Sequence, residues 1–125
     1  MYYDLLPKLK NAEAAGKETV LAPFSKMDLS VCKILADAGY IKDAKEKTLG
    51  RKRFIEIRMF GRRKRLINGV KIMSKPSRHL YFSYTDLRPV KSGHGIGVIS
   101  TSKGMMTQKE ARKKKVGGEY LFQIW

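Results

Sequence analysis

Two stretches in the first half of the chain carry apolar residues at helical spacing. The first stretch predicts a helix from about Asp4 to Ala15, which Gly16 would end. If Asp4 is the N-cap, Pro7 falls in the first turn, where its missing N–H costs no helical hydrogen bond. The apolar residues that share one face of this helix are Leu5, Leu6, Leu9 and Ala12.

The second stretch predicts a helix that begins at Ser25 and stops at Gly39. Ser25 and Asp28, three residues apart, form an aspartate version of the capping box. The apolar positions of this helix are Met27, Val31, Ile34, Leu35 and Ala38. Cys32 lies among them, so we expect a packed thiol rather than a reactive one.

Strand patterns surround these two helices. A short strand is expected over Thr19–Ala22, stopped by Pro23, and two more at Tyr40–Lys45 and Arg53–Phe60. In the last of these, apolar and charged residues alternate, which is the period of a half-buried strand. The first half is therefore predicted to be αβαββ, with two helices on one face of a small sheet.

The second half is dominated by strand patterns. A single short helix interrupts them, begun by a capping box of Thr107 and Glu110 and ended by Gly117-Gly118. The four expected strands are Leu66–Met73, Leu80–Tyr84, Ile96–Ser100 and Glu119–Trp125. We therefore predict an α+β fold of two small packed domains, residues 1–64 and residues 65–125, the second mainly β with one short helix.

Positive charge is concentrated in the second half. The formal net charge is +16, and residues 1–48 hold eight basic and seven acidic residues, whereas residues 49–125 hold nineteen and four. A solvated basic face kept for solubility would usually carry more interspersed acids and extend over both halves. A one-sided basic footprint is instead typical of nucleic-acid binding. The run Arg62-Arg63-Lys64-Arg65 is expected to be an exposed loop, and phosphate contact explains it more simply than a targeting signal does.

Other function classes lack their residues in this sequence. His79 and His94 are the only histidines, and no cysteine or acid stands beside them at metal-ligand spacing. A Gly-Lys-Ser/Thr phosphate loop and a local Ser-His-acid arrangement are both missing, and no apolar run approaches the ~20 residues of a membrane span. We expect no catalytic residue, metal, cofactor, small-molecule substrate or membrane partner. The single cysteine fits a reducing, cytoplasm-like compartment.

A hydroxyl-rich segment is the strongest candidate for chemistry. Ser100-Thr101-Ser102 ends an apolar strand pattern and is followed by Lys103 and Gly104. Small hydroxyls both donate and accept hydrogen bonds, and they let the backbone approach a ligand closely. Serine and threonine also often serve only as caps and turn residues. The lysine, the glycine and a second polar loop at Gly117-Gly118-Glu119 favour the binding interpretation.

The same segment belongs to a longer motif. Gly95 to Thr107, followed by Glu110-Ala111-Arg112 and Gly117-Gly118-Glu119, closely resembles the bacterial-type small-subunit ribosomal protein eight family, the universal uS8 type. The resemblance covers essentially the whole chain, because earlier landmarks of the family match in order. Those landmarks are Lys10-Asn11-Ala12, Pro23-Phe24-Ser25-Lys26, Ala38-Gly39-Tyr40-Ile41 and Ser74-Lys75-Pro76.

The resemblance implies a set of RNA contacts. It implies that a loop enters the minor groove of RNA, that a second loop touches the RNA, that one aromatic residue lies nearby, and that the N-terminal domain adds a lesser contact. The loop that would enter the minor groove consists of Ser100, Thr101, Ser102 and Gly104, with Lys103 alongside, and the second loop consists of Gly118 and Glu119. The nearby aromatic residue is Tyr81, and the lesser contact from the N-terminal domain is made by Ser25 and Lys26. In so cationic a half, Glu119 is expected to accept from a 2′-hydroxyl or a base amino group, or else to form an internal salt bridge.

We therefore expect a non-catalytic constituent of the small ribosomal subunit, in the ribosome of a bacterial cytoplasm or of an organelle. The resemblance implies that it binds the central domain of 16S rRNA and helps assemble the subunit platform. Its expected partners are that rRNA, neighbouring small-subunit proteins and, as a further candidate, its own messenger RNA. Arg51–Arg53, Arg62 and Arg63, and Lys113–Lys115 would add electrostatic affinity. The alternatives are a general RNA-binding chaperone without a fixed ribosomal site and an enzyme acting on a phosphate substrate.

Overall fold

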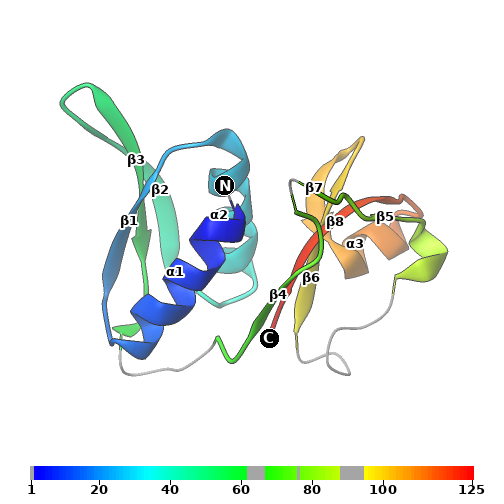
Figure 1. Cartoon of the computed structure of the whole chain (residues 1–125), viewed down its shortest axis with the longest axis horizontal. Coiled ribbons are helices and arrows are strands. Elements are labelled where there is room, and N and C mark those ends of the chain that lie inside the picture. Colours follow the sequence, from blue (N-terminus) through cyan, green and yellow to red (C-terminus); the bar gives the residue numbers. More distant parts are fainter. Residues whose placement is uncertain (1, 62–66, 76, 88–94) are drawn as a thin grey trace. The chain divides into compact units, whose positions relative to one another are not determined.

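A computed structural model divides the chain into two compact units. The structure describes residues 2–61, 67–75, 77–87 and 95–125. The N-terminal unit is Met1–Ile67 and the C-terminal unit is Asn68–Trp125. The expected boundary between residues 64 and 65 lies outside the described residues. Helices and antiparallel sheets occur in both units, which confirms the predicted α+β class (Figure 1).

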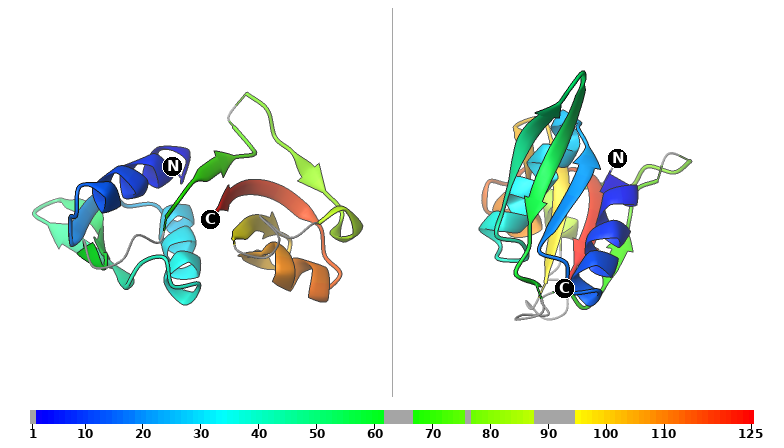
Figure 2. Two further views of the ribbon diagram at one scale, coloured as in Figure 1. Left: turned by 90° about the horizontal axis from the view of Figure 1, so that it is seen from below. Right: turned by 90° about the vertical axis from the view of Figure 1, so that its left-hand side faces the viewer.

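The N-terminal unit has the predicted order αβαββ. Its elements are α1 (Tyr2–Ala14), β1 (Thr19–Pro23), α2 (Lys26–Asp37), β2 (Asp43–Leu49) and β3 (Lys52–Arg58). The three strands form an antiparallel sheet in the order β1-β3-β2. Both helices lie on one side of this sheet, as Figures 1 and 2 show. Val20, Ala22, Ile55 and Ile57 are buried, and their neighbours in the strands are more exposed, as the alternating pattern requires.

The predicted start of the first helix is wrong. The helix begins at Tyr2, so Asp4 lies inside its first turn and is not the N-cap. Pro7 therefore lies beyond the first turn, where its lack of an N–H does remove a backbone hydrogen bond. The Tyr2 side chain is only 4% exposed, and its burial stabilises the early turn that Pro7 weakens.

The second helix begins and ends as predicted. The Ser25 side chain accepts a hydrogen bond from the N–H of Asp28 at 3.0 Å. At the other end, the N–H of Tyr40 donates to Leu35 O and that of Gly39, at φ +88°, donates to Ala36 O. These two bonds form a Schellman motif. The motif commits the Tyr40 backbone to the helix end, so the next strand begins at Asp43 and not at Tyr40 as predicted.

Cys32 is a buried thiol, as predicted. It has no exposed surface, and burial, with a smaller contribution from the charge of Asp28, raises its pKa from 9.0 to about 12. The neutral thiol therefore contributes stability that is present below pH 9 and is lost as the pH rises from 9 towards 12.

We expect Cys32 to resist alkylation in the folded protein. At pH 8, iodoacetamide should modify it at least about a hundredfold more slowly than in denaturant, because only the exposed thiolate reacts. Mass spectrometry over a time course measures this ratio. Equal rates in the native and denatured protein would show that the thiol is accessible.

The C-terminal unit is built around its last strand. Its strands are β4 (Val70–Ile72), β5 (Tyr81–Phe82), β6 (Ile96–Thr101), β7 (Gly104–Thr107) and β8 (Gly118–Ile124), with a 3₁₀ turn η2 (Tyr84–Asp86) and helix α3 (Gln108–Lys113). β8 pairs with β4, β5 and β6, and β7 pairs with the outer side of β6. One face of this sheet carries a core that consists of Leu87, Ile99, Met106, Ala111 and Tyr120. The helix α3 supplies Ala111 to this core.

Several details of this unit differ from prediction. Among the described residues, β4 covers only Val70–Ile72 of the expected strand Leu66–Met73, and β5 covers only Tyr81–Phe82 of the expected strand Leu80–Tyr84, with Tyr84 in η2. Strand β7 was not expected, because Gly104-Met105-Met106-Thr107 is short and carries no strand pattern of its own; pairing with β6 forms it. The helix α3 does start at the predicted cap, where Thr107 accepts from the N–H of Glu110, but Gly117 does not end it. It ends at Lys113, and Lys115 adopts the left-handed conformation at φ +57°.

Candidate functional site

The hydroxyl-rich segment is the turn of a β-hairpin. Thr101, at the end of β6, pairs with Gly104, at the start of β7, and leaves Ser102 and Lys103 as the two turn residues. The Thr101 hydroxyl donates to Gly104 O at 2.7 Å and accepts from Lys103 N–H at 3.1 Å. Thr101 therefore holds the turn together. Ser102 and Lys103 are exposed at its end, where a ligand can reach their side chains.

Strand pairing places three more of the expected site residues in one row. Tyr81 of β5 faces Glu119 of β8, which faces Ser100 of β6, which faces Met105 of β7. Directly opposed residues of paired strands project from the same face of a sheet. The neighbouring row, Tyr120, Ile99 and Met106, belongs to the core, so the Tyr81 row lies on the opposite face. Segments separated by about forty residues thus form one surface beside the turn.

Gly118 has a structural role in this arrangement. It pairs with Thr101, and a Cβ atom on it would overlap the carbonyl oxygen of Ser100 and lie 3.1 Å from Thr101 Cα. Only a residue without a side chain allows β8 to approach β6 this closely. Gly118 therefore brings the second loop against the first, whatever else it contacts.

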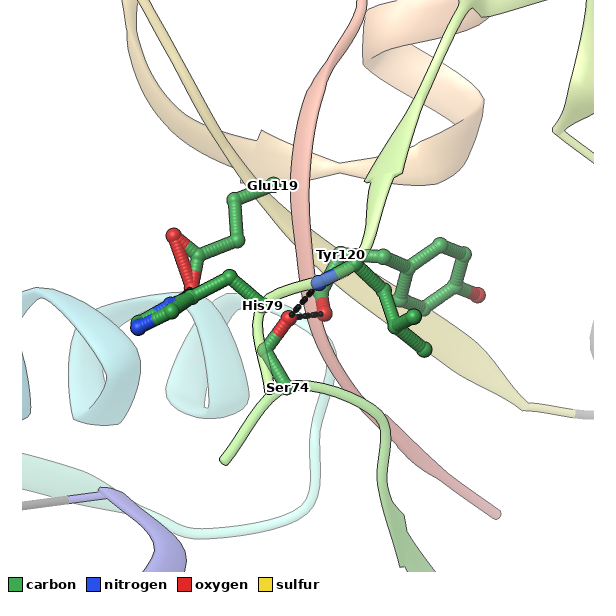
Figure 3. Close-up of polar contacts among 5 residues, drawn as sticks. Ser74, His79, Glu119 and Tyr120 are labelled. Atoms are coloured by element: carbon green, nitrogen blue, oxygen red, sulfur yellow. Dashed lines mark hydrogen bonds and ion pairs between the residues drawn. The ribbon is translucent and has the colours of Figure 1, made fainter. Parts of the chain in front are cut away.

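Glu119 has a partner within the protein. Its Oε1 lies 2.8 Å from Nδ1 of His79, and its side chain is 22% exposed. In Figure 3 the Glu119 and Tyr120 side chains leave β8 on opposite sides, with His79 beside Glu119. The structure thus contains the internal contact that the sequence left as one of two possibilities. Oε2 makes no hydrogen bond to the described residues, so the carboxylate can still accept from a ligand.

The segment that carries His79 is anchored by Ser74. This serine is fully buried, and its hydroxyl donates to Tyr120 O at 2.7 Å and accepts from Leu80 N–H at 2.9 Å (Figure 3). The N–H of Tyr120 in turn donates to Leu80 O at 2.8 Å. These bonds hold the chain before β5 against β8, next to Glu119. Neither Ser74 nor His79 has a role that is visible in the local sequence, because their partners Tyr120 and Glu119 lie forty or more positions away.

The remaining expected residues lie elsewhere. Ser25 and Lys26 begin α2 in the N-terminal unit, where the Ser25 hydroxyl accepts the capping bond and Lys26 is exposed. Arg62 and Arg63 lie outside the described residues. Tyr81 is 72% exposed, which leaves its ring free to stack on a partner.

Exposed cations are numerous in the C-terminal unit. In the described part of the C-terminal unit they include Lys75, Arg78, Lys103, Lys109, Arg112, Lys113, Lys114 and Lys115. The acidic residues described there are Asp86, Glu110 and Glu119, and the side chains of Ser83 and His79 already contact Asp86 and Glu119. The exposed residues of this unit are therefore mostly cationic, and they also include the aromatic ring of Tyr81 and the hydroxyl of Ser102.

The described residues contain neither a metal cluster nor a membrane span. No group of three or more His, Cys, Asp or Glu side chains within them could hold a metal ion. None of the described helices has the length and apolar character needed to cross a bilayer.

A strongly basic unit that also exposes an aromatic residue and a hydroxyl-bearing turn is typical of nucleic-acid-binding proteins. The sequence model of the family described as Ribosomal protein S8 matches residues 2–125. The small ribosomal subunit protein uS8 of Kosmotoga olearia is 44% identical over 98% of this chain and 95% of its own length. The uS8 proteins of Caldicellulosiruptor bescii and of an Arthrobacter species are 44% and 41% identical, each over 98% of this chain and 94% of its own length.

The chain belongs to the ribosomal protein S8 family. The family match confirms the resemblance seen in the sequence. Because this is a family of structural ribosomal proteins and not of enzymes, the match also excludes an enzyme that acts on a phosphate substrate.

Proposed function

We propose that this protein is a structural constituent of the small ribosomal subunit that binds the central domain of 16S rRNA and helps assemble the subunit platform. Membership of the family supports the ribosomal role. The observation that carries the RNA contact is the pairing of β5, β8, β6 and β7, which joins Tyr81, Glu119 and Ser100 into one surface beside the exposed Ser102. The site of action is then the ribosome of a bacterial cytoplasm, with neighbouring small-subunit proteins as further partners.

The chemistry of this surface fits the minor groove of RNA. An A-form helix displays 2′-hydroxyls and base edges in a wide, shallow minor groove. The Ser102 hydroxyl and the free oxygen of Glu119 can hydrogen-bond to these groups, and Tyr81 can stack on an unpaired base. Lys103 and the cations after α3 hold phosphates and add affinity that falls with salt. The same surface would accept a messenger RNA that presents the same groups.

Ser102→Ala is expected to lower the affinity for a central-domain rRNA fragment by about 1 kcal/mol and to leave the fold intact, because one exposed hydrogen-bonding group is removed. Filter binding measures the affinity, and circular dichroism checks the fold. Ser77→Ala, which changes another exposed serine of the same unit, is the matched control and should bind like the wild type. Equal affinity of Ser102→Ala and wild type would remove Ser102 from the site.

A general RNA chaperone would carry the same charge without a preferred target. The two functions separate in a competition experiment between the central-domain fragment and an unrelated duplex of equal length. We expect the central-domain fragment to compete at least about a hundredfold better, since specific sites exceed nonspecific binding by several powers of ten. Equal competition would favour the chaperone.

A further inference from the structure

The hairpin of β2 and β3 extends beyond the sheet to which it belongs. β1 pairs with β3 only as far as Phe54, and the next residue, Phe24, donates its N–H to Arg53 O at 3.2 Å. Beyond that point β2 and β3 pair only with each other, and Figure 1 shows the hairpin projecting past the helices of its unit. We call Thr48–Lys52 the hairpin tip. All its residues are exposed, including Leu49 at 46%.

The three acids of the hairpin, Asp43, Glu46 and Glu56, each form at least one ion pair with a cation below the tip. Asp43 Oδ2 lies 3.7 Å from Arg58 Nη1, and Glu46 Oε1 lies 2.6 Å from Arg53 Nε. The carboxylate of Glu56 lies between two lysines, with Oε2 3.1 Å from Lys47 Nζ and Oε1 3.9 Å from Lys45 Nζ. The hydrogen bond from Lys47 lowers the pKa of Glu56, as that from Arg53 lowers the pKa of Glu46. Within the described chain, the two cations of the tip, Arg51 and Lys52, have no such partner. Uncompensated positive charge therefore collects where the hairpin projects furthest.

Arg53 is held in a fixed position at the base of the tip. Its guanidinium carbon lies 4.0 Å from the centre of the Phe24 ring, and its Nε donates to Glu46. This leaves its two terminal amino groups without a hydrogen bond to the described residues. A guanidinium stacked on a ring and fixed through Nε can offer a paired hydrogen bond to a phosphate at little entropic cost. Phe24 directly precedes Ser25 and Lys26, so Arg53 lies next to the start of α2.

We propose that the hairpin tip is a second rRNA contact, in which Arg51, Lys52 and Arg53 bind phosphates of the RNA backbone next to Ser25 and Lys26. The proposal rests on the proposed rRNA-binding function. It differs from that function in its site, since all these residues belong to the N-terminal unit, and in its chemistry, since phosphates position an RNA without reading its sequence. Charge complementarity favours RNA over a protein partner, because the tip carries two free cations and a single exposed apolar side chain.

The test uses two charge-matched variants and a transcript of the 16S rRNA central domain. Arg51→Gln/Lys52→Gln removes the tip cations, and Lys10→Gln/Lys33→Gln removes two exposed lysines from the helices of the same unit. Filter binding over a salt series should show about a tenfold weaker affinity for the tip variant. The slope of log affinity against log salt should become shallower by nearly two units, since each phosphate contact contributes about 0.9. The control should change less than about twofold.

Arg53→Lys tests the fixed guanidinium separately. It keeps the charge and loses the planar fork, so we expect about a threefold loss of affinity with a nearly unchanged salt slope. In the Ser102→Ala background, the tip substitutions should lower the RNA affinity by the same factor as in the wild type, because contacts in different units act independently.

Each other outcome has a defined meaning. Equal losses in the tip variant and the control would mean that only overall charge matters and would overturn the proposal. Unchanged affinity of the tip variant, with Ser102→Ala still impaired, would assign the tip to another partner and leave the proposed function standing. A wild-type protein that bound the transcript no better than an unrelated duplex would overturn the proposed function, and the second rRNA contact with it.

Discussion

Gly118→Ala is expected to destabilise the C-terminal unit by about 3 kcal/mol or more, at the upper end of what overpacking costs. The added methyl group would overlap a backbone carbonyl, that of Ser100, and would lie close to Thr101 Cα. Backbone atoms of two paired strands cannot move aside as the end of a flexible side chain can. Relief therefore requires that β8 separate from β6 and give up ladder hydrogen bonds and core contacts.

Chemical denaturation measures the effect. Trp125 is the only tryptophan of the chain and follows β8 directly, so its fluorescence reports the unfolding of this unit. Gly50→Ala is the matched control: nothing lies within 4 Å of its added Cβ, and only the strain of its φ of +62° remains, about 1 kcal/mol. Circular dichroism measures the unfolding of the Gly50→Ala variant, because Gly50 lies in the N-terminal unit and Trp125 does not. A Gly118→Ala protein within 1 kcal/mol of wild type would show that β6 and β8 are further apart than described.

Ser74→Ala is expected to lower the free energy of unfolding by about 2 kcal/mol. The substitution removes a fully buried hydroxyl that hydrogen-bonds two backbone groups, Leu80 N–H and Tyr120 O. A water molecule could replace the hydroxyl only if the surrounding residues left room for it. The chain between Ser74 and β5 should then open more often. As a result, the contact of His79 with Glu119 should weaken although neither residue is changed.

Denaturation and hydrogen exchange together check this prediction. The Leu80 amide should exchange at least about tenfold faster in Ser74→Ala than in the wild type, while amides of the N-terminal unit stay unchanged. Ser77→Ala, three residues away and exposed, should alter stability by less than about 0.5 kcal/mol. If Ser74→Ala matched this control, the hydroxyl would not be the anchor of the segment.

Much of the fold follows from local sequence. The order of elements in the N-terminal unit, the Ser25 cap and the Gly39 stop were predicted, because apolar periodicity and capping residues act over a few positions. Errors arose where packing overrides local preference. Tyr2 extends α1 ahead of its expected cap, and the end of α2 removes Tyr40 from the following strand. β7 exists only because a turn folds it onto β6.

The sequence predicted which residues belong to the candidate site but not how they are arranged. Sequence motifs named Ser100, Ser102, Glu119 and Tyr81 as site residues, and those assignments remain proposals. Strand pairing shows that three of them share one face, that Thr101 is used inside the turn and that Gly118 sets the strand spacing. Such roles depend on partners far away along the chain, which a local pattern does not contain.

The amino-acid sequence by itself determined the fold class, the unequal distribution of charge and the family, because composition, periodicity and motif order are properties of the chain alone. Only the tertiary structure decided how its polar residues are used. It pairs Glu119 with His79, fixes Arg53 between Phe24 and Glu46, and leaves Ser102, Arg51 and Lys52 exposed. The physical reason is that a hydrogen bond or an ion pair depends on distances of a few ångströms, and folding sets those distances between residues that the sequence keeps apart.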